Sequence, residues 1–302
     1  MRPALLALVS APGGLVLALL AVSGAIGMDP ARAAPVAVPA SDEAQVAPSD
    51  GFDLSGDLTQ GGFIRGKVPK GTVSASFDGE KLEFAADGEF FAAFDRDAGP
   101  SARLIARLAN GTTIERALAI SPRNWDIEKV NVPLTVSMPT AEFLKLRKPE
   151  LAQINAARAK RTDADGWREH FIWPVKGRIS GKFGSQRIYK GGEKGSYHSG
   201  IDIATGESGT PIVAPADGVV ILVAKQPFTL EGNLLMIDHG MGLNSAFLHC
   251  SEIEVKEGEH VKQGQFIARI GMTGRATGPH LHWGLKWHDA RLDPLLFTGP
   301  MN

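Results

Sequence analysis

The chain has 302 residues, of which 43% are hydrophobic and 22% are charged, and its formal net charge is -1. This composition is that of a globular protein, and the length is sufficient for two domains. A near-neutral chain lacks the basic balance of a nucleic-acid-binding protein, so we expect no nucleic-acid partner. The single cysteine, Cys250, can form no disulfide within the chain. We expect it to be a small buried core residue rather than a metal ligand.

Residues 1–33 have the features of a secretory signal peptide. An arginine near the start is followed by an apolar run at 15–28 and by the small-x-small sequence Ala31-Arg32-Ala33. A retained membrane anchor is the alternative, because the uncharged run 3–28 approaches spanning length, although a Pro-Gly-Gly sequence interrupts it. We therefore expect an exported protein of the periplasm or cell envelope, tethered to a membrane only if this segment is retained. Residues 34–50 have no periodic apolar pattern, which indicates a flexible tether.

Residues 51–122 contain short alternating or apolar runs separated by turn sequences such as Asp78-Gly79, Asp87-Gly88 and Asn110-Gly111. This pattern is typical of antiparallel strands and predicts a small β-sandwich. The region contains no histidine and no carboxylate pair at catalytic spacing, so we expect it to bind or position something rather than to catalyse. The six expected strands are 63–68, 73–77, 81–84, 89–94, 102–108 and 112–120.

Residues 123–170 are predicted to form a helical linker. Thr140 can cap a helix, and Pro149 predicts a break or kink before a second helical segment through Leu151 and Ile154. Its basic side chains could meet an acidic partner, but we expect a solvated face. These side chains are Lys145, Arg147, Lys148, Arg158, Lys160 and Arg161.

Residues 171–302 are rich in glycine and in short apolar runs, which predicts a predominantly antiparallel sheet or open barrel. The fold class of the whole chain is therefore mainly β: a small N-terminal β-sandwich, a helical linker and a C-terminal Gly-rich antiparallel sheet. The expected C-terminal strands are 177–183, 201–204, 211–214, 218–224, 233–238, 244–249, 264–270 and 280–286.

Histidines gather in this last region. Strand alternation predicts that His280 and His282 point the same way, and His198 and Asp202 share a face of an extended segment. Zinc in hydrolytic sites takes three ligands of these types and leaves a fourth position for water. His198 and Asp202 with one member of the His280/His282 pair complete that set. The other member, or His249 at a strand end, could move a proton or stabilise an oxyanion.

At these residues, from about Trp173 to Pro294, the chain resembles the lysostaphin/LytM-type zinc metallopeptidases, which cleave peptide cross-links of bacterial cell walls. The resemblance implies that His198, Asp202 and His282 bind Zn2+ and that His249 and His280 are catalytic. Many relatives carry Tyr where this chain has Phe247, and Cys250 replaces a frequent Leu. The matching segments are Tyr197-His198-Ser199-Gly200-Ile201-Asp202, Ala214-Pro215-Ala216-Asp217-Gly218, Phe247-Leu248-His249-Cys250-Ser251 and Gly274-Arg275-Ala276-Thr277-Gly278-Pro279-His280-Leu281-His282.

The resemblance implies a zinc-dependent peptidoglycan (murein) endopeptidase, acting on peptidoglycan peptide stems and expected to be a monomer. In a cell with an outer membrane it would cut between D-alanine and meso-diaminopimelate; elsewhere, a glycine bridge. The alternatives are a non-catalytic LytM-like activator or scaffold for other hydrolases, and a metal-independent wall-binding module.

The residues around the expected site are expected to contact substrate, to pack in the core or to lie at turns and on the surface. Arg187 and Tyr189, just before the first expected ligand, are expected to contact substrate, Arg187 through a substrate carboxylate. Trp173 and Phe183 are expected to pack in the core. The other histidines, His170, His239, His260 and His288, are expected to be turn, surface or satisfied core residues.

Overall fold

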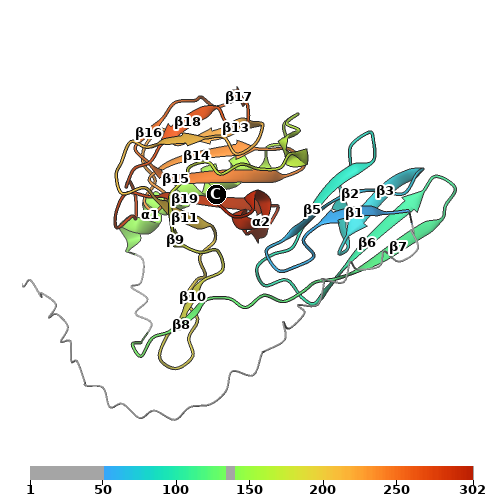
Figure 1. Cartoon of the computed structure of the whole chain (residues 1–302), viewed down its shortest axis with the longest axis horizontal. Helices are drawn as coiled ribbons and strands as arrows, with labels where there is room; N and C mark the ends of the chain where they lie inside the picture. The colour runs from blue at the N-terminus through green and yellow to red at the C-terminus, as the bar shows by residue number, and fades with distance from the viewer. Residues whose placement is uncertain (1–50, 134–139, 302) are drawn as a thin grey trace, which may run out of the picture. The chain divides into compact units, whose positions relative to one another are not determined.

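The computed structural model describes residues 51–133 and 140–301, so the expected signal peptide and tether lie outside the described residues. Strands dominate these residues, as expected from the sequence (Figure 1). The part of the chain that is described contains no helix long and apolar enough to cross a membrane.

The N-terminal region contains two antiparallel sheets. Phe77 ends a strand of one sheet and Phe94 directly follows a strand of the other, and their ring centroids lie 5.8 Å apart. Alternate residues of β6 (Ser101–Leu108) point inward. All six expected strands are present, and β1 is an addition. One sheet has the order β1-β2-β5, formed by Asp53–Gly56, Phe63–Lys67 and Glu89–Ala93. The other has the order β4-β3-β6-β7, formed by Glu80–Leu82, Thr72–Phe77, Ser101–Leu108 and Thr113–Ala119.

The linker forms one helix, α1 (Ala141–Ala159), so a break at Pro149 is wrong, while the alternative of a kink there stays a prediction. Thr140 caps the helix as expected, since its hydroxyl accepts a hydrogen bond from the backbone N–H of Phe143 at 3.0 Å. A proline in a helix interior costs roughly 3 kcal/mol. Packing of Ile154 and Ala157 against the C-terminal sheet offsets this cost and keeps the second half helical.

The basic face of α1 is not fully solvated, in contrast to the expectation. Arg147 pairs with Glu231, and the ammonium of Lys160 donates a hydrogen bond to the carbonyl of Ile221 at 2.7 Å. Residues far away in the sequence therefore supply partners that the helix sequence alone does not indicate.

The C-terminal region contains an eight-stranded antiparallel sheet, here called the main sheet, with the order β17-β13-β14-β15-β19-β11-β9 and with β20 beside β19. All eight expected strands are present in this region. The main sheet is formed by His260–Val261, Gly218–Val223, Asn233–Asp238, Leu243–Cys250, Leu281–Trp287, Ile201–Ala204, Arg178–Gly181 and Ala290–Leu292. A second sheet has the order β12-β18-β16, formed by Pro211–Val213, Phe266–Arg269 and Glu252–Ile253.

The remaining elements are short. Strands β8 (Ile127–Lys129) and β10 (Gln186–Ile188) pair in parallel, a 3-10 turn η1 spans Gly166–Arg168, and α2 spans Pro294–Thr298. None of these was expected from the sequence, because runs of three to five residues carry too little periodic signal.

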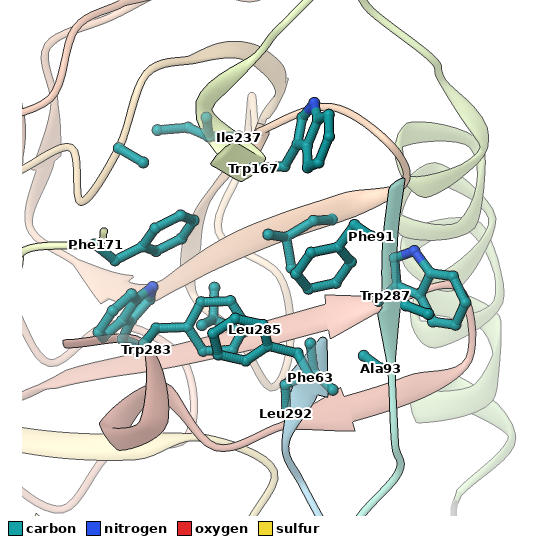
Figure 2. Packing of buried hydrophobic residues seen from close by; sticks show 14 of the residues in the cluster. Phe63, Phe91, Ala93, Trp167, Phe171, Ile237, Trp283, Leu285, Trp287 and Leu292 are labelled. Carbon is teal, nitrogen blue, oxygen red and sulfur yellow. The ribbon is translucent and has the colours of Figure 1, made fainter. Parts of the chain in front are cut away.

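One hydrophobic core runs through the N-terminal strands and the main sheet (Figure 2). Phe63 stacks on Phe297 with ring centroids 4.0 Å apart, and Phe91 meets Trp287 edge to face at 6.2 Å. The guanidinium of Arg65 donates to two backbone carbonyls of the segment before the main sheet, at 2.5 and 2.6 Å. The N-terminal strands therefore support the sheet that carries the candidate site.

A buried hydrogen-bond chain lies beneath β19. The side chain of Trp283 donates to the hydroxyl of Ser245 at 3.3 Å, and this hydroxyl lies 2.7 Å from Nε2 of His239. The other ring nitrogen, Nδ1, lies 2.8 Å from the carbonyl oxygen of Asp217. A carbonyl only accepts, so Nδ1 carries the proton and Nε2 accepts from Ser245. His239 is therefore a fully buried, neutral imidazole in the turn expected after β14.

Burial lowers the pKa of His239 to about 4, whereas an unfolded histidine titrates near 6.5. Stability from this residue is fully present above pH 6.5 and is lost as the pH falls toward 4. We expect the free energy of unfolding to fall by about 3 kcal/mol more in the native chain than in a His239→Gln variant over this range. Urea denaturation at several pH values measures the difference. The exposed His260→Gln change is the control, and equal losses in all three proteins would contradict the prediction.

Candidate metal centre

Three side chains converge on the face of the main sheet where β11 and β19 pair. Asp202 lies directly opposite His282 in the antiparallel register, so both side chains project from the same face. The Oδ1 atom of Asp202 is 2.9 Å from Nδ1 of His282. His198, in the segment before β11, brings its Nε2 atom to 3.1 Å from the Asp202 oxygen and 3.0 Å from the His282 nitrogen.

These three atoms fit the donor set of a zinc ion. Tetrahedral zinc with bonds of 2.0–2.1 Å places its ligand atoms roughly 3.3 Å apart, close to the 2.9–3.1 Å separations of this cluster. The carbonyl oxygen of Lys182 lies 3.0 Å from Nδ1 of His198. This carbonyl accepts a hydrogen bond from Nδ1–H, so Nε2 of the neutral ring keeps a lone pair for a metal ion shared with the other two ligand atoms.

The electrostatics of the cluster favour cation binding. Burial alone would raise the pKa of Asp202, but the close His198 and His282 imidazoles lower it far below its usual value. Burial, together with the nearby His198, lowers the pKa of His282 despite its bond to Asp202. Burial also acts to lower the pKa of His198, but the Asp202 carboxylate raises it overall. At neutral pH the cluster therefore holds an ionised carboxylate and a neutral His282, the forms that bind a metal.

His249 and His280 lie beside the cluster, with ring centroids 4.9 Å apart. The Nδ1 atom of His280 is 2.9 Å from the carbonyl oxygen of Gly278, and that of His249 is 2.8 Å from the carbonyl oxygen of Thr273. Each carbonyl accepts a hydrogen bond from Nδ1–H, so Nε2 is the unprotonated nitrogen of the neutral ring. The Nε2 atom of His280 is 3.9 Å from Oδ1 of Asp202. Both histidines can therefore accept a proton beside the three donors.

The position of His249 depends on a bulge in β15. Leu248 pairs with His282, so simple alternation would send the next side chain to the opposite face. The register between β14 and β15 shifts in this stretch, and His249 adopts a φ of 65°. The shift returns its ring to within 6.4 Å of the His282 ring centroid. A left-handed backbone at a non-glycine residue costs of order 1–3 kcal/mol, and strain of this kind gathers at functional sites.

Two glycines allow the cluster to form. A Cβ atom on Gly181 would lie 2.4 Å from Oδ2 of Asp202, and one on Gly200 would lie 2.8 Å from Nε2 of His282. No role for Gly181 was expected from the sequence. Its place beside Asp202 follows from the pairing of β9 with β11, which no local pattern reveals.

We expect Gly181→Ala to lower zinc affinity about 10- to 100-fold, because the added methyl group displaces the Asp202 carboxylate while the backbone stays in the allowed region. Competition with a chromogenic chelator measures the affinity. Gly99→Ala is the matched control, since a Cβ there meets nothing within 4 Å. Zinc binding by Gly181→Ala at native strength would contradict the importance of this contact.

The two expected substrate contacts lie on and after β10. The Nε atom of Arg187 donates to a carboxylate oxygen of Glu128 on β8 at 2.7 Å, and both side chains are exposed. The backbone N–H of Tyr189 donates to the carbonyl of Glu193 at 2.8 Å. A substrate contact by either side chain stays a prediction.

Of the two expected core residues, Phe183 is buried and Trp173 is half-buried against the core. Phe183 packs against Trp125 with ring centroids 5.7 Å apart, and Trp173 meets Trp283 at 6.2 Å. Cys250 is fully buried, and burial raises the pKa of its thiol to about 12. A thiol in this state is a packing group, as expected. The histidines at 170, 260 and 288 are exposed.

Residues 196–294 match Peptidase family M23. The chain is 41% identical over 115 residues to the peptidoglycan DD-endopeptidase ShyA of Vibrio cholerae, covering 37% of this chain and 26% of that protein. It is 48% identical over 98 residues to the peptidoglycan DD-endopeptidase ShyB of the same species, covering 32% and 22% of the two chains. A crystal structure of a protein assigned to peptidase M23 from Pseudomonas aeruginosa has a TM-score of 0.61 at 29% identity, covering 81% of this chain and 96% of that chain.

The matched segment contains all three members of the cluster and both adjacent histidines. M23 peptidases are zinc-dependent, which agrees with the fit of the His/Asp/His donor set. The chain spans about a quarter of the length of the curated relatives it matches.

Proposed function

We propose that this chain, whose residues 196–294 match Peptidase family M23, is a zinc-dependent peptidoglycan endopeptidase that hydrolyses peptide cross-links of the bacterial cell wall. The observation that carries the proposal is the convergence of one carboxylate and two imidazole donors on one face of the main sheet. The names of the relatives, peptidoglycan DD-endopeptidases, support the substrate class.

In this proposal His198, Asp202 and His282 hold the metal. Bound zinc supplies Lewis acidity and lowers the pKa of water toward about 7. The Nε2 atom of His249 or His280 takes the proton, and the other ring stabilises the oxyanion or protonates the leaving amine. The carbonyls of Gly278 and Thr273 support these roles because they orient the rings through Nδ1.

We place the substrate and the protein in the cell envelope. Residues 1–33 carry the signal-peptide features that would export the chain. In a cell with an outer membrane, the bond cut would be that between D-alanine and meso-diaminopimelate. A non-catalytic activator is disfavoured by the complete donor set and by the two adjacent imidazoles with free Nε2 atoms.

Digestion of purified peptidoglycan by the full chain tests the proposal. We expect mass spectrometry to show that cross-linked muropeptide dimers decrease and monomers increase, that a chelator stops this change, and that added zinc restores it. Dimers that stay intact in the presence of zinc would contradict the enzyme assignment and favour a regulatory role.

A further inference from the structure

A cavity of about 260 Å³ lies between α1 and the face of the main sheet that carries His282. The helix supplies one wall, because residues three or four positions apart fall on one helix face. Alternate residues of β19, namely His282, Gly284 and Lys286, supply part of the floor. The cavity therefore begins at the candidate metal centre and continues along β19.

One end of the cavity is electrically balanced. The guanidinium of Arg147 forms two hydrogen bonds with the Glu231 carboxylate, at 2.6 and 2.8 Å, and a third with Glu150 at 3.1 Å. Glu150 also accepts hydrogen bonds from the backbone and hydroxyl of Thr229, both at 2.7 Å. These contacts hold α1 against the sheet and occupy the acidic groups at this end.

The other end carries an excess of positive charge from Arg158, Lys286 and Arg291. The Nε atom of Arg158 is buried and has no hydrogen-bond partner among residues 51–133 and 140–301. Burial lowers the pKa of Arg158, and the charge of Arg291 lowers it further. Burial and the Arg158 charge likewise lower the pKa of Lys286, and its ammonium pairs at 3.2 Å with the fully exposed carboxylate of Asp289.

This arrangement costs folding free energy, because desolvated like charges repel and a buried donor is unpaired. A ligand carboxylate would relieve both penalties, since a guanidinium and an ammonium donate charge-assisted hydrogen bonds to it. Lys286 lies four residues beyond His282 on β19, which corresponds to roughly 13 Å at the rise of a strand. An extended peptide covers this distance in about four residues.

We propose that the cavity between α1 and β19 binds a free carboxylate of the stem peptide through Arg158, Lys286 and Arg291, about four residues from the bond that is cut. The proposal rests on the proposed function for the nature of the ligand. It makes α1 part of the substrate site, and it makes the charge state of the stem peptide a determinant of specificity.

The test compares cross-linked stem-peptide dimers bearing free carboxylates with the same dimers converted to carboxamides. We expect kcat/KM of the zinc-loaded full chain to be about tenfold or more higher for the free acids, as hydrogen bonds to charged groups imply. Arg158→Gln and Lys286→Gln should each reduce this preference mainly by slowing cleavage of the acids. Lys148→Gln, on the exposed face of α1, removes a charge without touching the cavity and should leave the preference unchanged. Equal rates for both dimers, or an undiminished preference in both cavity variants, would overturn the proposal.

Binding of an uncross-linked stem peptide separates this proposal from the proposed function, because it requires no cleavage. Calorimetry with the zinc-loaded chain should show tighter binding of the free acid than of the carboxamide, and this difference should shrink in Arg158→Gln and Lys286→Gln. Equal binding of the two peptides would overturn the carboxylate site even if the enzyme is active. Thermal melting confirms folding: removal of the buried Arg158 charge should leave the melting temperature at or above that of the native chain.

Discussion

Replacement of His282 by alanine is expected to abolish stoichiometric zinc binding and to lower the rate of cross-link cleavage by roughly three orders of magnitude, equivalent to about 4 kcal/mol. The Nδ1 atom of His282 lies 3.0 Å from the His198 nitrogen and 2.9 Å from the Asp202 oxygen, so its loss leaves two donors of three. Zinc content by elemental analysis and muropeptide release measure the two effects.

The fold should survive this change, because β19 keeps its backbone pairing with β15 and β11. A metal that binds only the folded state raises the melting temperature, so added zinc should stabilise the native chain and not His282→Ala. The control is His260→Ala, which removes an exposed histidine of β17. A His282→Ala protein with full zinc content and full activity would refute the assignment of the ligands.

Replacement of His280 by alanine is expected to keep the zinc and to lower kcat about 10²- to 10⁴-fold, the usual range for loss of a positioned acid or base. Its Nε2 atom lies 3.9 Å from the Asp202 oxygen, outside the three-donor cluster, while its Nδ1 atom is held by the Gly278 carbonyl. Steady-state kinetics and zinc analysis on the same preparation distinguish a proton-transfer role from a ligand role.

His249→Ala provides the companion measurement. Burial and the neighbouring His280 lower the pKa of His249, so its imidazole is neutral at pH 7 and can accept a proton. We expect each single variant to retain zinc, and the double variant to lose far less than the product of the two single effects if the rings act in one step. Loss of zinc in His280→Ala, with no loss in His282→Ala, would exchange the roles of the two residues.

Most of the secondary structure and the identity of the candidate site residues could be predicted from the sequence. The eight expected C-terminal strands and the Thr140 cap are present because alternation, turn residues and capping act between near neighbours. The break expected at Pro149 is absent because packing against the main sheet outweighs a local penalty. The contacts that keep the helix continuous at Pro149 form only in the folded chain, so the helix sequence alone does not predict them.

By itself, the sequence determined which residues could form a metal site: the His280/His282 pair and the His198/Asp202 motif. The tertiary structure alone decided how they meet, because Asp202 and His282 become neighbours through the pairing of β11 with β19, 80 residues apart. The same holds for the bulge that turns His249 toward the site and for the docking of α1, which places Arg158 at the cavity beside the main sheet. These features depend on the register and docking of distant segments, and short-range sequence patterns predict neither the register nor the docking.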